Sequence, residues 1–439
     1  MPRTLHWIGY TTLYREGGAQ LAQAARTLAD DLRAEGHAVR LARVESKRDV
    51  VDEMARLRGE GERLDGFHFV GHSGMYGPMF RTTAMPEQFS PHEWRSLAED
   101  GAIPFADGGE AWFHACRTAR WFAPFFARTF GVPAHGYHWY TSFSTRKDRF
   151  KWPGPFHRAD APLHLIGVKG NKSHGVVGSA LKYAGFAEAE VMKRYEPTPV
   201  EGDASYDSVA ELYDAVFEDI RVREDEWRWI QAHLPDAPKP RVLDIGCGNG
   251  ALLRQLAPRI ASGHGVDGSH GMIRVAERHD NPAHLAFSRV DSPTLPFPDA
   301  SFDVVISLLS FRYLDWDPLM NEIRRVLAPG GRILVVDMVT APVGPREVPR
   351  FLKDSARAVL QRKLRPRYQA ALGRLVSDSR WRTMLEYNPI RAQHEMVWYL
   401  ESRFPGREVE LLNVGWHARV LAFDSGPLQP GSVAPQSYP

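Results

Sequence analysis

The run from Val242 to Gly250 constrains the fold of this 439-residue chain more than any other feature. It begins as an apolar strand that reaches Asp244, and it continues as a turn with glycine at every second position. Glycine adopts backbone angles that other residues avoid, and it lets a ligand lie against the main chain. A helix is expected from Ala251, and its first amide groups would face a ligand at the turn. The run therefore predicts a site for a small nucleoside-like ligand.

The apolar runs that follow indicate a sheet with acidic residues at its strand ends. The second expected strand ends at Asp267 and the third ends at Asp291. A carboxylate at the first position accepts hydrogen bonds from ribose hydroxyls, and one at the second accepts from an exocyclic amine. Residues 302–307 predict a fourth strand, and a helix over 319–327 should stop at the Pro-Gly-Gly breaker of residues 329–331, before a fifth strand. This alternation predicts an α/β fold with a doubly wound parallel sheet.

Taken in order, these motifs resemble those of the class I S-adenosylmethionine-dependent methyltransferases. The motifs are Asp244-x-Gly246-x-Gly248-x-Gly250, Asp267, Asp291 and the segment from Arg325 to Gly331. The resemblance covers about residues 201–425, and it includes a lead-in helix from Tyr206 and a closing pair of strands. A nicotinamide-binding turn of the G-x-G-x-x-G type would place its last glycine at Ala251, so the later motifs distinguish the two families.

The resemblance implies S-adenosylmethionine as the cofactor and gives individual residues a role. The main chain from Gly246 to Gly248 would follow the methionine part of the cofactor, and Asp244 would lie near its ammonium group. Asp267 would hold the ribose, and Asp291 would receive the adenine amine. The cofactor-binding set implied in this way is Tyr213, Asp244, Gly246, Cys247, Gly248, Gly250, Asp267, Gly268, Met272, Asp291, Ser292 and Leu308. Met272 is equally well explained as a helix-core residue, and Arg312 and Tyr313 are expected to face the methyl acceptor.

A helical insertion of about residues 342–405 separates the fifth strand from the closing pair. Its part from Arg346 to Arg382 contains eleven Lys or Arg residues and three acidic ones. A solvated helix face explains this charge, and a lid for an acidic substrate or a basic docking surface is the alternative. No nucleic-acid-binding motif accompanies the charge, so we do not expect a nucleic-acid partner.

The first 193 residues predict a second doubly wound α/β domain. Expected strands at residues 5–10, 39–44, 66–71 and 111–115 alternate with helices of 3.6-residue apolar periodicity, and a further strand is expected near residue 134. His72 and Cys116 follow two successive strands at their carboxyl ends, where open parallel sheets place their sites.

The pattern of strand-His-x-Gly and strand-Ala-Cys-Arg resembles the caspase-like cysteine peptidases. By this resemblance Cys116 would attack a carbonyl group and His72 would carry the proton. The pattern departs from the family at Ser73, which separates the histidine from Gly74, and at Arg117, where a smaller residue is common. Two alternatives stay open: Cys116 is a small buried side chain beside a hydrogen-bonded histidine, or the domain only binds a peptide or a partner.

The histidine-rich stretch from His135 to His174 lacks the spacing of a ligand set and any cysteine pair, so we predict no metal site. Two cysteines in separate motifs are typical of reduced thiols, which favours a cytoplasmic protein. No apolar run has membrane-spanning length, and a net charge of +2 gives no bulk attraction to anionic partners, so we expect no membrane partner. The sequence leaves the oligomeric state open.

We therefore expect a caspase-like domain over residues 1–193, a linker over 194–204, a methyltransferase domain over 205–425 and a disordered tail over 426–439. The expected function is methyl transfer from S-adenosylmethionine to a small-molecule or peptide-derived acceptor, with substrate selection by the first domain. A bifunctional protein with peptidase or acyl-transfer activity at Cys116 and His72 is one alternative. A binding protein that senses the cofactor is the other.

Overall fold

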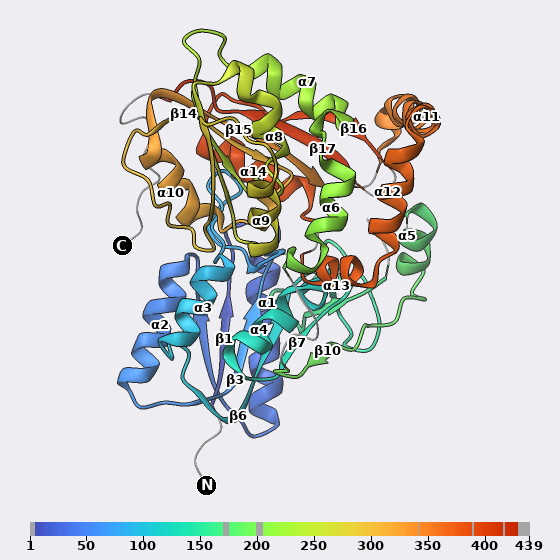
Figure 1. Cartoon of the computed structure of the whole chain (residues 1–439). Coiled ribbons are helices and arrows are strands. Elements are labelled where there is room, and N and C mark those ends of the chain that lie inside the picture. Colours follow the sequence, from blue (N-terminus) through green and yellow to red (C-terminus); the bar gives the residue numbers. More distant parts are fainter. Residues whose placement is uncertain are drawn as a thin grey trace. The chain divides into compact units, whose positions relative to one another are not determined.

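A computed structural model describes residues 5–169, 175–198, 205–341, 343–388, 390–415 and 418–428 (Figure 1). The chain divides into two compact units, one ending at Pro199 and the other beginning at Val200. The predicted tail lies outside the described residues except for residues 426–428. Each unit has its own sheet and its own core, so the two are described separately.

The first unit contains a six-stranded sheet in the order β10-β7-β6-β3-β1-β2. Five strands run parallel, and the edge strand β10 pairs antiparallel with β7. The sheet strands are β1 (Leu5–Tyr10), β2 (Ala38–Arg43), β3 (Leu64–Val70), β6 (Phe105–His114), β7 (Ala134–Gly136) and β10 (Lys193–Tyr195). Strand β10 extends this unit two residues into the segment predicted as linker, because its pairing with β7 needs Arg194 and Tyr195.

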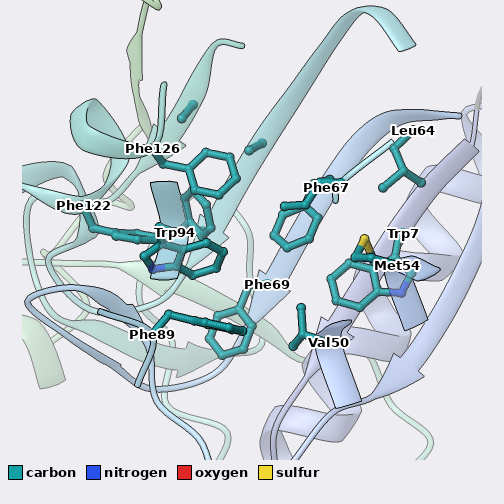
Figure 2. Packing of buried hydrophobic residues seen from close by; sticks show 14 of the residues in the cluster. Trp7, Val50, Met54, Leu64, Phe67, Phe69, Phe89, Trp94, Phe122 and Phe126 are labelled. Atoms are coloured by element: carbon teal, nitrogen blue, oxygen red, sulfur yellow. The ribbon is translucent and has the colours of Figure 1, made fainter. Parts of the chain in front are cut away.

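Helices cover both faces of this sheet, as the alternation of strands and helices predicts. The helices are α1 (Gly18–Ala34), α2 (Lys47–Gly59), α3 (Pro91–Glu99), α4 (Phe122–Phe130) and α5 (Gly175–Tyr183). Helix α1 packs on the face that contains Ile8, while α2, α3 and α4 pack on the face that contains Trp7. Figure 2 shows the aromatic part of that second core, in which Trp94 lies among phenylalanine rings. Two short hairpins, β4 (Ser73–Gly74) with β5 (Gly77–Pro78) and β8 (Thr141–Ser144) with β9 (His164–Gly167), were not predicted.

The second unit contains a seven-stranded sheet in the order β13-β12-β11-β14-β15-β17-β16. The first five strands run parallel, and β17 and β16 add antiparallel at one edge. The strands are β11 (Arg241–Ile245), β12 (Ser262–Asp267), β13 (Leu285–Arg289), β14 (Phe302–Leu308), β15 (Leu327–Val339), β16 (Glu410–Val414) and β17 (Arg419–Asp424). The sheet is therefore mixed, with the parallel, doubly wound core that the sequence predicts and the antiparallel closing pair.

Helices lie on both faces of this sheet. The helices that build the fold are α6 (Ala210–Phe217), α7 (Glu224–His233), α8 (Ala251–Leu256), α9 (His270–Arg278), α10 (Trp316–Val326) and α14 (Gln393–Arg403). Side chains of α7 and α8 pack on the face of Val242, and those of α10 and α14 pack on the face of Leu243. Helix α14 lies in the predicted insertion, yet Met396 and Leu400 make it part of the core.

Two boundaries differ from the sequence expectation. Helix α10 ends at Val326, and β15 begins at Leu327 and includes the Pro-Gly-Gly segment, because the strand pairs with Phe302 before its register shifts. The remaining insertion folds as α11 (Val348–Leu364), α12 (Pro366–Ser377) and α13 (Ser379–Tyr387). Helix α12 packs on α6, so the insertion rests on the lead-in segment of the second unit.

Candidate functional site

The glycine turn follows β11 at the carboxyl edge of the parallel strands. Gly246 has a φ of 72°, Gly248 of 54° and Gly250 of 74°, which is the left-handed region that favours glycine. The amide groups of Gly246 and Cys247 donate to the carbonyl oxygen of Val266 at 2.8 and 3.0 Å, so the turn is fixed to the end of β12. The main chain of the turn is thereby held in place before any ligand binds.

A cavity of about 340 Å³ opens beside this turn. Its size is that of a site for a small organic molecule. Many of the residues predicted from sequence line it: Tyr213, Gly246, Gly248, Asp267, Gly268, Met272, Asp291, Ser292, Leu308 and Tyr313. The structure thus brings together groups from the lead-in helix, three strand ends and the segment after β14.

Asp267 connects the ends of β11 and β12 within this cavity. Its carboxylate accepts hydrogen bonds from the amides of Gly248, at 2.9 Å, and Ser269, at 2.8 Å. Burial raises the pKa of Asp267, although these two amide donors favour the charged form. One carboxylate therefore both fixes the glycine turn and faces the cavity.

Asp244 lies beneath the turn, with 1% of its surface exposed. Its Oδ1 atom is buried and accepts no hydrogen bond from any residue that the structure describes. Burial, together with the charge of Asp267, raises the pKa of Asp244 to about 8. A cation bound nearby would favour the ionised form, which fits the ammonium or sulfonium group of S-adenosylmethionine.

The space above the glycines fits a ligand that lies against the main chain. A Cβ atom added at Gly248 would have Tyr213 as its nearest neighbour, at 3.8 Å, and one added at Gly268 would be 3.8 Å from the carbonyl oxygen of Val290. Both added atoms would be at ordinary van der Waals distance from cavity-lining residues, and neither would clash with them. The residues present therefore fit the cofactor that the sequence implies.

Asp291 and Ser292 lie at the exposed rim of the cavity, after β13. The Asp291 carboxylate accepts a hydrogen bond from Arg289 at 2.5 Å. This pair holds Asp291 in place, and its second oxygen is the group that an exocyclic amine would reach in the predicted role.

Aromatic rings form one wall of the cavity. The hydroxyl of Tyr206 donates to that of Tyr313 at 3.3 Å, and Tyr213 packs edge-on against Tyr206, with ring centroids 5.9 Å apart. Trp381 of α13 lies 6.0 Å from Tyr206, again edge-on. Burial raises the pKa values of both Tyr206 and Tyr213, so both stay neutral hydroxyl groups near neutral pH. The insertion thus packs against this wall through Trp381 of α13.

The structure places Arg312 away from the cavity lining, where the sequence predicts a substrate-facing side chain. Its guanidinium forms an ion pair with Asp337 of β15, and the two side chains are 8% and 0% exposed. It also donates to the hydroxyl of Tyr313 at 2.8 Å. Arg312 therefore positions Tyr313, which does line the cavity.

Three predicted cofactor-binding residues also stand behind the lining: Asp244, Cys247 and Gly250. Burial raises the pKa of the Cys247 thiol well above its ordinary value. Gly250 caps α8 in the left-handed conformation, and Phe287 packs so closely there that an added Cβ would be 2.6 Å from its ring. These residues shape the turn from behind.

Sequence reasoning missed Ser310, Asp315 and Asn388, which line the cavity. Asp315 occupies the cap position before α10, but its side chain makes no capping hydrogen bond. Asn388 follows α13, and no local pattern distinguishes it.

In the first unit, His72 and Cys116 follow neighbouring parallel strands. Val70 of β3 pairs with His114 of β6, and each site residue comes two positions later, so both lie at the same edge of the sheet. The amide of Thr141 donates to the Cys116 sulfur at 3.3 Å. Burial lowers the pKa of His72, which keeps its imidazole neutral and able to accept a proton.

Within the described parts of the chain, no group of three or more His, Cys, Asp or Glu side chains has an arrangement that could hold a metal ion. His174, which belongs to the histidine-rich stretch, lies outside the described residues. Over those same parts, no helix has the length and apolar character needed to cross a membrane.

Comparison with known proteins gives consistent matches. Residues 243–335 match the family described as a methyltransferase domain. The chain is 36% identical over 131 residues to the demethylmenaquinone methyltransferase of Thermus thermophilus, and this match covers 29% of this chain and 58% of that relative. It is 31% identical over 201 residues to the 27-O-demethylrifamycin SV methyltransferase of Amycolatopsis mediterranei, and this match covers 40% of this chain and 73% of that relative.

Among solved structures, an S-adenosylmethionine dependent methyltransferase from Mesorhizobium loti is 29% identical, with a TM-score of 0.25, over 26% of this chain and 53% of that one. The chain thus spans little more than half of the length of the Thermus relative.

Proposed function

The chain belongs to the S-adenosylmethionine-dependent methyltransferases, and we propose that its second unit transfers a methyl group to a small-molecule or peptide-derived acceptor. The observation that carries this proposal is the cavity, in which the glycine turn, Asp267 and Asp291 face one space beside an aromatic wall. Two relatives named for small-molecule acceptors, demethylmenaquinone and 27-O-demethylrifamycin SV, support this class of acceptor.

The chemistry needs little from the protein beyond positioning. S-Adenosylmethionine supplies a methyl group that its positively charged sulfur already activates. The turn and the carboxylates would hold the cofactor, and the wall of Tyr206, Tyr213 and Tyr313 would exclude water and align the acceptor. An acceptor oxygen or nitrogen needs a group that takes up its proton, and Asp315 is a carboxylate in the cavity lining that suits this role.

Calorimetry on the full chain tests cofactor binding. We expect both S-adenosylmethionine and its demethylated product to bind the wild-type protein, and Gly248→Arg to abolish binding because its side chain would enter the cavity. Gly101→Arg is the matched control, since Gly101 has a similar φ of 58° and open space around it, in the first unit. The absence of heat with wild-type protein, or equal binding by Gly248→Arg, would refute the proposed site.

Turnover distinguishes an enzyme from a cofactor sensor. Incubation with methyl-labelled S-adenosylmethionine and a panel of phenolic, quinone and peptide acceptors should transfer label to at least one of them. Binding of the cofactor without transfer to any acceptor would favour the sensor alternative.

For the first unit we propose substrate selection, with cysteine-based peptidase or acyl-transfer chemistry as the second candidate. The placement of His72 and Cys116 after paired neighbouring strands favours that second candidate. An iodoacetamide probe should then label Cys116 faster than an unactivated thiol, and His72→Ala should remove the excess rate. Labelling at the rate of free cysteine in both proteins would leave substrate selection as the role of this unit.

A further inference from the structure

Helix α11 exposes apolar side chains along much of its length. The exposed fractions are 43% for Val348, 60% for Leu352, 52% for Val359, 56% for Leu360 and 70% for Leu364. Because successive helical residues are about 100° apart, these five side chains fall within an arc of about 160°. They form one face, which we call the apolar face of α11.

The opposite side of α11 is the side that attaches it to the second unit. Arg357 donates to Asp225 of α7 at 2.9 Å, and Arg365, which follows the helix, donates to Glu224 at 2.7 Å. Gln361 also donates to Glu224, at 3.0 Å.

The strand next to α11 receives two further contacts. Arg350 donates to the carbonyl oxygen of Leu412 at 2.9 Å, and the amide of Val414 donates to Asp354 at 3.0 Å. Phe351 is the buried apolar residue on this side. The orientation of a typical surface helix is thus reversed: the charged side is held against the protein and the apolar side faces outward.

The charges around the apolar face are positive. Lys353 and Lys363 are exposed and project within the same arc as the leucines. Asp354 is the single acidic residue in the sequence of α11, and it lies on the attached side, where its side chain is 13% exposed. The outward side therefore combines apolar groups with cations and offers no carboxylate of its own helix.

We propose that the apolar face of α11 binds the surface of an anionic lipid membrane, with the helix lying in the plane of the interface. Leucine and valine side chains would enter the boundary of the acyl chains, and the two lysines would extend to the phosphate groups. Charge complementarity favours this occupant over a nucleic acid, which offers no apolar layer for five aliphatic side chains. Sequence reasoning expected no membrane partner because it considered spanning length and net charge, and neither describes the face of one helix.

Lipid binding goes beyond the proposed function, because it requires neither the cofactor nor an acceptor. It would place the second unit where apolar acceptors concentrate.

Vesicle flotation with the full chain tests the proposal. We expect the protein to float with phosphatidylcholine vesicles that contain about one third phosphatidylglycerol, and to bind pure phosphatidylcholine less, with binding reduced by salt. Leu352→Gln combined with Leu360→Gln should lower the partition coefficient at least about tenfold. Lys353→Glu combined with Lys363→Glu should remove the preference for the anionic vesicles.

The matched control replaces two exposed apolar residues elsewhere, Leu13→Gln with Val51→Gln in the first unit, and should leave flotation unchanged. The proposal would be overturned if the wild-type protein floated with neither kind of vesicle. It would also be overturned if the glutamine variant of α11 floated as the wild type does. Concentration-dependent dimerisation that the α11 variant abolishes would overturn it too, because a second copy would then cover this face. Calorimetry with S-adenosylmethionine on the same variants should give wild-type affinity, so failure of lipid binding is distinguishable from failure of the proposed function.

Discussion

Replacement of Asp337 by asparagine should destabilise the second unit by about 3–5 kcal/mol, because it leaves the Arg312 guanidinium buried without its counter-charge. Asp337 is completely buried, and besides the ion pair it accepts hydrogen bonds from the amides of Arg312 and Met338, each at 2.6 Å. Burial alone would lower the pKa of Arg312, but the charge of Asp337, together with Tyr313 and Tyr206, raises this pKa overall. The guanidinium of the variant therefore stays charged at pH 7.

Arg312→Met should cost less than Asp337→Asn, by about 1 kcal/mol or more. In this variant the carboxylate keeps its two amide donors. The asparagine variant instead leaves a buried guanidinium, which does not lose its proton in proteins. Which of the two variants loses more stability is thus a stricter test than the magnitude of either loss.

Thermal unfolding followed by calorimetry measures both losses. For a unit of this size, 3–5 kcal/mol corresponds to a fall of roughly 6–20 °C in Tm. Glu211→Gln is the matched control, because Glu211 and Arg278 form an ion pair whose side chains are 69% and 56% exposed, and we expect it to change stability by less than about 1 kcal/mol. If Arg312→Met unfolds at the wild-type temperature while the KM for the acceptor rises, then Arg312 contacts substrate and does not have a structural role.

Three further predictions concern the cofactor, the first unit and the glycine turn. Affinity for S-adenosylmethionine should fall as the pH falls below about 8, by up to about tenfold per pH unit, because a bound cation favours ionised Asp244. Calorimetry should show that Asp244→Asn loses this pH dependence. An affinity of the wild-type protein that does not change with pH would contradict the prediction. Burial lowers the pKa of His114 from 6.5 to about 4, so the unfolded chain binds more protons than the folded chain as the pH falls through 6.5. About 3 kcal/mol of stability should therefore be lost between pH 6.5 and 4. Denaturant titrations should show a smaller loss in His114→Gln, and an equal dependence of stability on pH in the two proteins would exclude this histidine as the cause. Gly246→Ala should lower the free energy of unfolding by about 1–3 kcal/mol more than Gly330→Ala does. Both glycines have positive φ, but only an alanine at 246 would bring a Cβ within 2.3 Å of Ser310. Equal denaturation midpoints for the two variants would show that the turn can shift.

Much of the second unit was predictable because its signals are local. The apolar run before Gly246, the glycine spacing and the acidic residues at 267 and 291 each depend on a few consecutive positions, and the structure places them around one cavity. The Pro-Gly-Gly segment shows the limit of such signals. It was interpreted as the end of a helix, but it belongs to β15, because pairing with Phe302 of a neighbouring strand decides where the helix ends.

The segment after β14 shows the same limit at the site. The sequence predicts that Arg312 faces the methyl acceptor, whereas in the structure Arg312 is buried and Asp315 lines the cavity. Whether Arg312 is buried depends on Asp337, which lies 25 residues further along the chain in β15. The sequence around Arg312 gives no sign of this partner. A buried carboxylate attracts the nearby guanidinium because that pairing offsets the burial of both charges.

The sequence by itself determined the class of fold, the glycine turn and the acidic strand ends, since backbone freedom and hydrophobic period are properties of neighbouring residues. Only the tertiary structure decided which charged side chains face the cavity, and which side of α11 faces solvent. Those outcomes depend on partners such as Asp337 and Asp225, which lie far along the chain from the residues they hold. A helix with arginines on one side and leucines on the other has no inherent outer face, and the carboxylates of α7 select it here.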